Sequence, residues 1–185
     1  MKMIRKNIIF CIIFLSFMTN QLFSVESQNQ IELNKQAPIF VLRDLNGNTV
    51  FLRDYCGNLR KPWKNNIKHI VILSFFTSYC KPCLKEIPIL EKLAAKYKNA
   101  KLKIFLINYR ESEDIVKRYL KDKGFSLPVL LDRYAVVAEK YKVTSVPRIF
   151  VINRDGDLIW MTKGYDVDLA DNLEKILEQQ LKKRE

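Results

Sequence analysis

Histidine is nearly absent from this chain, with His69 alone among 185 residues. His69 begins an apolar run that predicts a buried strand, and Cys80 and Cys83 follow the last residue of that run. The histidine and the cysteines are therefore expected at opposite ends of one strand. Protein metal sites are commonly built from several cysteine and histidine ligands, so this separation counts against a metal centre that uses both residue types.

Long apolar segments are also scarce. The longest, Ile8–Met18, is shorter than the about 20 residues that a membrane-spanning helix needs. Three basic residues precede it and two small residues follow it: Lys2, Arg5, Lys6, Ser24 and Ser27. This is the three-part pattern of a secretory signal peptide. We expect residues 1–27 to be a signal peptide, or alternatively an uncleaved N-terminal anchor, and the remainder to be exported to a periplasmic or other extracytoplasmic compartment.

Acidic residues are outnumbered, with 20 Asp and Glu against 32 Lys and Arg and a formal net charge of +12. The lysines are spread along the chain, which indicates a solvated basic surface; peripheral membrane association or attraction to acidic partners is the alternative. The sequence carries no recognisable nucleic-acid-binding motif, so we expect no nucleic-acid partner. A hydrophobic content of 48% argues against disorder and favours one domain with a proper core.

The chemistry is concentrated between residues 74 and 88. The run from His69 to Phe76 is apolar except for Ser74 and predicts a strand that is covered on both faces. Cys80 and Cys83 follow it in a C-x-x-C spacing. Apolar residues then recur with the period of a helix: Leu84, Ile87, Leu90, Leu93 and Ala94.

A cysteine at such a strand-to-helix junction faces unpaired amide N–H groups and the positive end of the helix dipole, and both favour the thiolate. Cys80 is therefore the predicted attacking sulfur, and Cys83, one turn further on, is placed to resolve a mixed disulfide. Pro82 fits the first helical turn, and Lys81 adds a positive charge that should lower the pKa of the nucleophile. The same spacing also suits half of a zinc site, so the spacing alone does not distinguish a redox pair from metal ligands.

The rest of the chain alternates strands and helices. After a leader at residues 28–37, the predicted domain spans residues 38–185 and closes with a hairpin and a helix. Expected strands lie at 39–42, 49–52, 69–76, 101–108, 127–131, 148–153 and 158–162. One expected helix follows the cysteine pair and ends near residue 99. Three more are expected at 113–123, 133–141 and 168–181. This order predicts an α/β fold with a mixed sheet between helices.

The C-x-x-C at a strand-to-helix junction, Pro88 five residues after it, and Val146-Pro147 opening a strand resemble the thioredoxin superfamily from about residue 36 to the C-terminal end. Within it, the inserted strand and helix between Phe125 and Tyr141, Glu86 three residues after Cys83, and the signal peptide resemble exported thiol-disulfide oxidoreductases of the ResA/TlpA type. The resemblance implies a thioredoxin-like fold with a mixed central sheet, an N-terminal hairpin and an inserted strand and helix.

The resemblance also implies roles. Cys80, Cys83 and Glu86 would be catalytic, with Glu86 handling the protons of the cysteines in place of a buried thioredoxin Asp whose position is occupied by Ser74. An exposed helix carboxylate is the alternative for Glu86. The implied substrate-binding residues are Tyr79, Lys81, Pro82, Val146 and Pro147. Pro147 would be a cis-proline against the disulfide, and Val146 would offer backbone hydrogen bonds to an extended substrate.

Two further residues are candidates. Glu111 matches a second acidic position near the site in some relatives of this type. Cys56 lies in a polar loop and is either a lone thiol shielded by packing or a third redox-active cysteine.

We therefore expect an exported thiol-disulfide oxidoreductase without a cofactor or metal. By resemblance, its targets are disulfides of exported proteins such as apocytochromes c, and a membrane thiol carrier supplies its electrons. One alternative is a thiol peroxidase, because Thr77-x-x-Cys80 imitates the peroxiredoxin Thr–Cys pair, although Leu73 stands where that family has proline. The other is a metal-binding or metal-delivery module that uses Cys80 and Cys83.

Overall fold

The computed structural model describes residues 31–61 and 66–182. The chain divides into a unit of residues 1–31 and a second unit of residues 32–185, and the elements below all belong to the second. The predicted signal peptide at residues 1–27 and the first three residues of the predicted leader lie outside the described residues.

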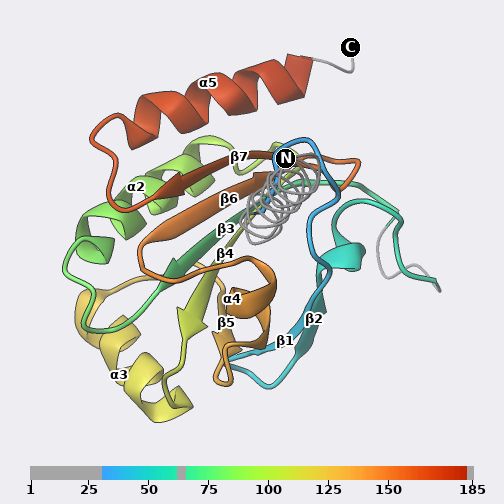
Figure 1. Cartoon of the computed structure of the whole chain (residues 1–185). Helices are drawn as coiled ribbons and strands as arrows, with labels where there is room; N and C mark the ends of the chain where they lie inside the picture. Colours follow the sequence, from blue (N-terminus) through green and yellow to red (C-terminus); the bar gives the residue numbers. More distant parts are fainter. Residues whose placement is uncertain (1–30, 62–65, 183–185) are drawn as a thin grey trace, which may run out of the picture. The chain divides into compact units, whose positions relative to one another are not determined.

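The second unit is built on a seven-stranded mixed sheet in the order β2-β1-β5-β4-β3-β6-β7 (Figure 1). The strands are β1 (Val41–Asp44), β2 (Thr49–Phe51), β3 (Ile70–Phe76), β4 (Leu102–Tyr109), β5 (Val129–Asp132), β6 (Arg148–Ile152) and β7 (Leu158–Lys163). The three central strands β3, β4 and β5 run parallel, and every other pairing is antiparallel. The predicted α/β fold with a mixed sheet and an N-terminal hairpin is confirmed.

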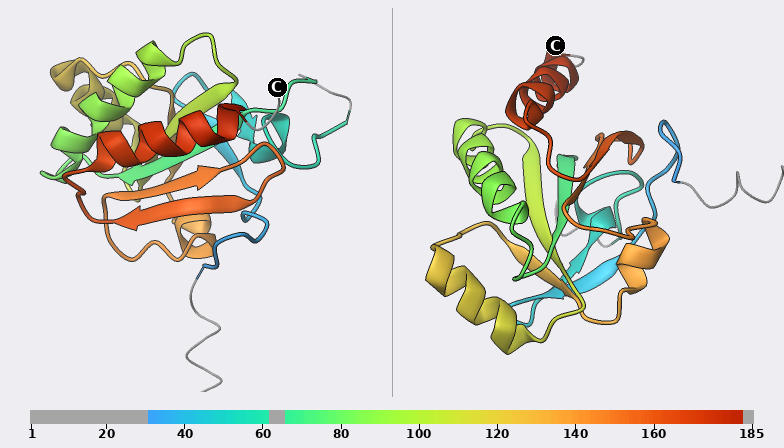
Figure 2. Two further views of the ribbon diagram at one scale, coloured as in Figure 1. Left: turned by 90° about the horizontal axis from the view of Figure 1, so that it is seen from above. Right: turned by 60° about the vertical axis from the view of Figure 1, so that its left-hand side comes forward.

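Three helices cover one face of this sheet: α2 (Cys83–Lys96), α3 (Glu113–Lys123) and α5 (Leu169–Lys182). Their apolar stripes share one core cluster with alternate residues of β3, β4 and β6 (Figure 2). The short helix α4 (Val136–Lys140) packs on the other face, where Tyr141 lies with its ring 5.0 Å from Phe150 and 5.9 Å from Phe75. Because β3 is covered on both faces, all seven of its residues are buried.

Local sequence signals predicted most ends of the helices and strands to within two residues. Gly124 ends α3 in the left-handed conformation at φ 67°, as its position predicts. Ser112 stands at the N-cap, but its side chain makes no capping hydrogen bond. The α4 helix begins three residues later than predicted because Asp132 caps it from the end of β5, through the amides of Val137 and Ala138 at 3.2 and 2.7 Å.

The second half of the predicted leader is not loose. Residues 34–37 run beside the turn between β6 and β7, where the Asn34 amide donates to the Leu158 carbonyl at 2.7 Å and the Ala37 amide to the Gly156 carbonyl at 2.8 Å. Gln36 forms an isolated bridge with Asp157. Within residues 31–61 and 66–182, the helices are all too short or too polar to cross a membrane.

Candidate active site

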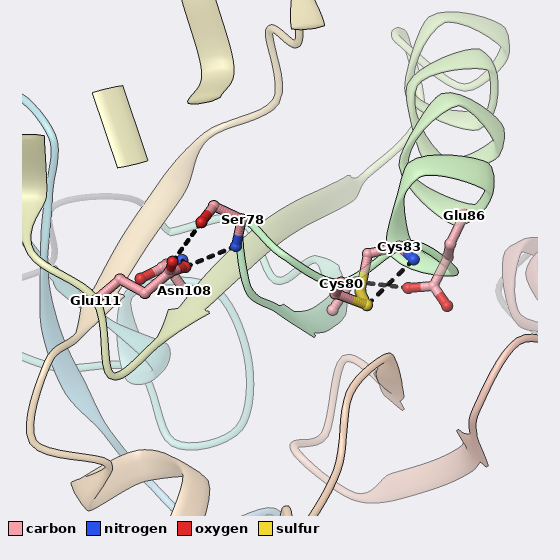
Figure 3. Close-up of a disulfide and its surroundings, with 7 residues drawn as sticks. Ser78, Cys80, Cys83, Glu86, Asn108 and Glu111 are labelled. Carbon is pink, nitrogen blue, oxygen red and sulfur yellow. Dashed lines mark hydrogen bonds between the residues drawn. A yellow bond between two sulfur atoms is a disulfide. The ribbon is translucent and has the colours of Figure 1, made fainter. Parts of the chain in front are cut away.

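The two candidate catalytic cysteines form a disulfide where β3 runs into α2. Cys80 lies in the turn after β3, and Cys83 is the first residue of the helix. The Cys83 amide N–H at the start of the helix is shared between Cys80 Sγ at 3.2 Å (Figure 3) and the Cys80 carbonyl at 3.1 Å. This geometry favours negative charge on Cys80 when the disulfide is reduced.

The two sulfurs differ in access. Cys80 is 6% exposed and Cys83 is completely buried. Of the two sulfurs, only Cys80 therefore offers surface to an incoming disulfide, and the roles of attacking and resolving thiol stay predictions.

Glu86 lies one helical turn after Cys83 and is only 1% exposed. The Ser74 hydroxyl donates to Glu86 Oε1 at 2.7 Å, whereas Oε2 has no hydrogen-bond partner. Burial raises the pKa of the Glu86 carboxyl to about 7, and the hydrogen bond from Ser74 opposes part of that rise. An exposed helix carboxylate, the alternative reading of the sequence, does not describe this residue. Glu86 can accept or release a proton near neutral pH beside the buried sulfur.

Glu111 holds the turn that precedes Cys80 (Figure 3). Its carboxylate accepts hydrogen bonds from the Ser78 amide at 2.7 Å, the Ser78 hydroxyl at 2.5 Å and Asn108 Nδ2 at 2.7 Å. Arg110, just before it, adopts a left-handed backbone at φ 62°, a conformation that is costly for a residue other than glycine. This bend directs the Glu111 carboxylate to Ser78. We therefore interpret Glu111 as a residue that positions the turn before Cys80.

Replacing Glu111 by glutamine should loosen this turn. The amide group would set one of its own donors against the donors of Ser78 or Asn108, and an unmet buried donor costs about 2 kcal/mol. We expect a lower melting temperature and slower disulfide exchange. Glu113→Gln is the matched control, because Glu113 is exposed and pairs with Lys117 across one helical turn. Equal melting temperatures for the two variants would contradict this role.

The predicted substrate-binding residues gather around the disulfide. Tyr79 is 75% exposed, and Lys81 and Pro82 are also at the surface. Val146 packs against the core cluster that includes both cysteines, and its peptide bond to the buried Pro147 is cis, as the resemblance implies. Their role in binding a substrate stays a prediction.

Cys56 lies at the other end of the sheet. The neighbouring Tyr55 carbonyl accepts from the His69 amide, which precedes β3, whereas Cys80 follows β3. Seven strand residues separate these ends by about 20 Å. Cys56 is buried and unpaired, and burial raises the pKa of its thiol to about 12. These facts support the shielded thiol over a third redox-active cysteine.

Cys56→Ala is accordingly expected to leave disulfide turnover within about twofold of the parent protein, with a loss of stability near the 1 kcal/mol typical of point substitutions. Steady-state turnover and thermal unfolding of the same samples provide the measurement. A large loss of turnover at unchanged stability would show that Cys56 takes part in the reaction.

The alternative chemistries find little support in the geometry. No group of three potential metal ligands occurs among the described residues, and His69 lies at the end of β3 away from the cysteines. The Thr77 hydroxyl, which a peroxidase would aim at Cys80, is buried without a hydrogen-bond partner.

Comparison with known proteins supports the thioredoxin-like fold and the disulfide chemistry independently of this geometry. The chain is 31% identical over 156 residues to the thiol-disulfide oxidoreductase ResA of Bacillus thuringiensis subsp. konkukian, covering 84% of this chain and 80% of that one. A candidate protein disulfide isomerase from Bacteroides thetaiotaomicron is 26% identical, with a TM-score of 0.72 over 83% of this chain and 92% of that one. A candidate interchange protein DsbE from Chlorobium tepidum shares the fold at 24% identity, with a TM-score of 0.71 over 82% of this chain and 99% of that one.

Residues 33–161 match the AhpC/TSA family, and this match includes the disulfide, Glu86 and Glu111. The chain therefore belongs to the AhpC/TSA family of thioredoxin-like proteins, within which it is a thiol-disulfide oxidoreductase similar to ResA.

Proposed function

We propose that the protein reduces disulfides in other exported proteins. The Cys80 thiolate attacks a target disulfide, one target sulfur leaves as a thiolate, and Cys80 becomes joined to the other. Cys83 then loses its proton and attacks Cys80, which releases the reduced target and forms the Cys80–Cys83 disulfide. Two electrons pass to the target in each cycle. A membrane thiol carrier returns them by reducing the Cys80–Cys83 disulfide.

The proposal that the protein acts as a reductant rests on a buried carboxyl, Glu86, and a buried sulfur, Cys83, on the same helix. Cys83 is completely buried and Glu86 is 1% exposed, one turn away on the same helix. Burial disfavours a thiolate at Cys83, and an ionised Glu86 would disfavour it further by repulsion. Cys83 therefore stays a neutral thiol and adds no thiolate stabilisation to the reduced pair, which favours donation of electrons to a target. A strong oxidant requires the opposite, a stabilised reduced form.

Glu86 also fits the role of proton acceptor. Its pKa of about 7 lets it take the proton of the Cys83 thiol when that thiol attacks the mixed disulfide. Ser74 orients the carboxyl for this step by holding Oε1, whereas Oε2 accepts no hydrogen bond from the described part of the chain.

The proposed targets are apocytochromes c, as the ResA/TlpA resemblance implies. These proteins attach haem through a C-x-x-C-H segment whose cysteines must be reduced. A peptide with an oxidised C-x-x-C-H segment should accept electrons from the reduced protein faster than a peptide whose two cysteines have a different spacing. Equal rates would remove the argument for this target class.

A redox titration of the Cys80–Cys83 pair tests the direction. We expect a reduction potential near that of thioredoxin, about −270 mV, because burial and the carboxyl keep Cys83 from stabilising the reduced pair as a thiolate. A potential near the −120 mV of a strong oxidant would contradict the proposed reductive function and would indicate disulfide formation instead.

A further inference from the structure

The end of the sheet away from the disulfide gathers basic side chains from five separate parts of the chain. We call it the basic end and define it by Lys35, Lys68, Lys98, Lys101, Lys103 and Arg154. These residues come from the segment before β1, the residue before His69, the loop before β4, the start of β4 itself, and the turn between β6 and β7. In both Figure 1 and Figure 2, this turn lies on the same side as the end of α5 and the loop that precedes β3.

Backbone contacts hold these segments together. The Lys101 carbonyl accepts from the Ile70 amide at 2.8 Å, the Arg154 carbonyl accepts from the Gly57 amide at 3.0 Å, and the Lys35 carbonyl accepts from the Leu158 amide at 2.9 Å. Lys68 Nζ lies 3.5 Å from Asp155 Oδ1. The basic end is thus a fixed part of the domain and not a loose tail.

Three carboxylates at this end are engaged within the protein. Asp54 pairs with Arg60 at 3.0 Å, Asp155 pairs with Lys68, and Asp157 accepts from Gln36 at 2.5 Å. They offset only part of the positive charge. His69 lies close to three of these cations: burial lowers its pKa most, Lys103, Lys101 and Arg154 lower it further, and a backbone hydrogen bond with Ile67 opposes them.

Exposed aliphatic side chains accompany the charges. Leu33 and Ile67 both have over two fifths of their surface exposed, next to Lys35 and Lys68 in the sequence. Lysine beside exposed aliphatic residues is the composition of a surface that binds at the interface of an anionic membrane.

The chain leading from the predicted signal or anchor enters the domain at this same end. Residues 34–37 pair beside the β6–β7 turn, and the apolar run Ile8–Met18 precedes them in the sequence. The basic end is therefore the end at which the domain is joined in sequence to the N-terminal residues.

We propose that the basic end lies against anionic lipid headgroups, so that the disulfide faces away from the membrane. Since β3 separates the two ends by about 20 Å, Cys80 would stand clear of the lipid surface and open to soluble protein targets. This orientation does not depend on whether the enzyme reduces or oxidises its targets.

The test compares the partitioning of the full chain into vesicles of phosphatidylcholine alone and of phosphatidylcholine mixed with phosphatidylglycerol. Binding through the apolar N-terminal run contributes to both, so the ratio of the two partition coefficients isolates the charge. Lys101→Glu combined with Lys103→Glu should lower this ratio at least about twentyfold, since each lysine near an anionic surface contributes about fivefold. Raised salt should reduce the ratio for the parent protein in the same direction.

Lys81→Glu combined with Lys85→Glu is the matched control, with the same charge change at the disulfide end, and should leave the ratio near that of the parent protein. Lys101→Gln with Lys103→Gln gives an intermediate loss and guards against misfolding, since both lysines are exposed. Equal losses from the two ends, or a parent ratio near one, would overturn the proposal. If the parent ratio were near one but binding to polyglutamate required Lys101 and Lys103, the face would serve an acidic protein instead.

Discussion

Replacing Cys80 by serine is expected to reduce disulfide turnover to the background rate of the reductant alone. The thiolate is the species that attacks a disulfide, and a serine hydroxyl remains protonated near neutral pH. The buried Cys83 cannot take over, because none of its surface is accessible to a protein disulfide. Turnover of a model disulfide protein with a supplied thiol reductant is the measurement.

Cys83→Ser gives the matched comparison. It leaves Cys80 able to attack but removes the sulfur that releases the target, so the protein should accumulate in a mixed disulfide after a single encounter. Both variants lose turnover, yet only Cys83→Ser should retain a covalently bound target. Substantial turnover by Cys80→Ser would contradict the proposed order of attack.

Glu86→Gln is expected to stabilise the oxidised protein at pH 8 by about 3 kcal/mol. The pKa of Glu86 rises from an ordinary 4.5 to about 7 on folding, so the folded state binds the proton more tightly than the unfolded state. The favourable contribution of this group is complete below pH 4.5 and is lost as the pH rises to about 7. Glutamine stays neutral throughout and can still accept the Ser74 hydrogen bond.

Denaturant unfolding of the disulfide-intact protein between pH 4.5 and 8 provides the measurement. The difference between the two proteins should be small at the acid end, grow with pH and level off above about pH 7. Glu178→Gln, an exposed carboxylate on α5, should show no such growth. A constant difference across this range would mean that Glu86 titrates normally and could not serve as the proposed proton acceptor.

The sequence predicted the elements that rest on local signals. Unbroken apolar runs located β3 and β4, and Gly124 located the end of α3. The start of α4 was missed, since Asp132 acts as its cap from the neighbouring strand and Ala135 takes a left-handed backbone at φ 61°. A signal of this kind is visible only after the strand and the helix are placed together.

The burial of Glu86 follows from a pattern that was present in the sequence. Glu86 falls in the same helical stripe as Cys83, Ile87 and Leu90, which are all buried, and Ser74 faces that stripe from β3. Spacing along the helix could have placed the carboxyl inside the protein. Its raised pKa could not have been predicted, because it depends on how completely the surrounding sheet and helices exclude water.

The contacts of Glu111 could not have been predicted from local sequence. Ser78 follows β3, whereas Asn108 and Glu111 come from the end of β4, and only the parallel pairing of these strands joins them. The position of Cys56 is equally non-local, since its separation from Cys80 is set by the length of β3.

Mass spectrometry of the mixed disulfide formed by the Cys83→Ser variant tests the central claim most directly. After reaction with an oxidised target and quenching by acid, proteolysis should yield the target peptide joined to the peptide that contains Cys80, with Cys56 still a free thiol. Attachment of the target at Cys56, or no covalent species at all, would contradict an attack by the sulfur that precedes α2.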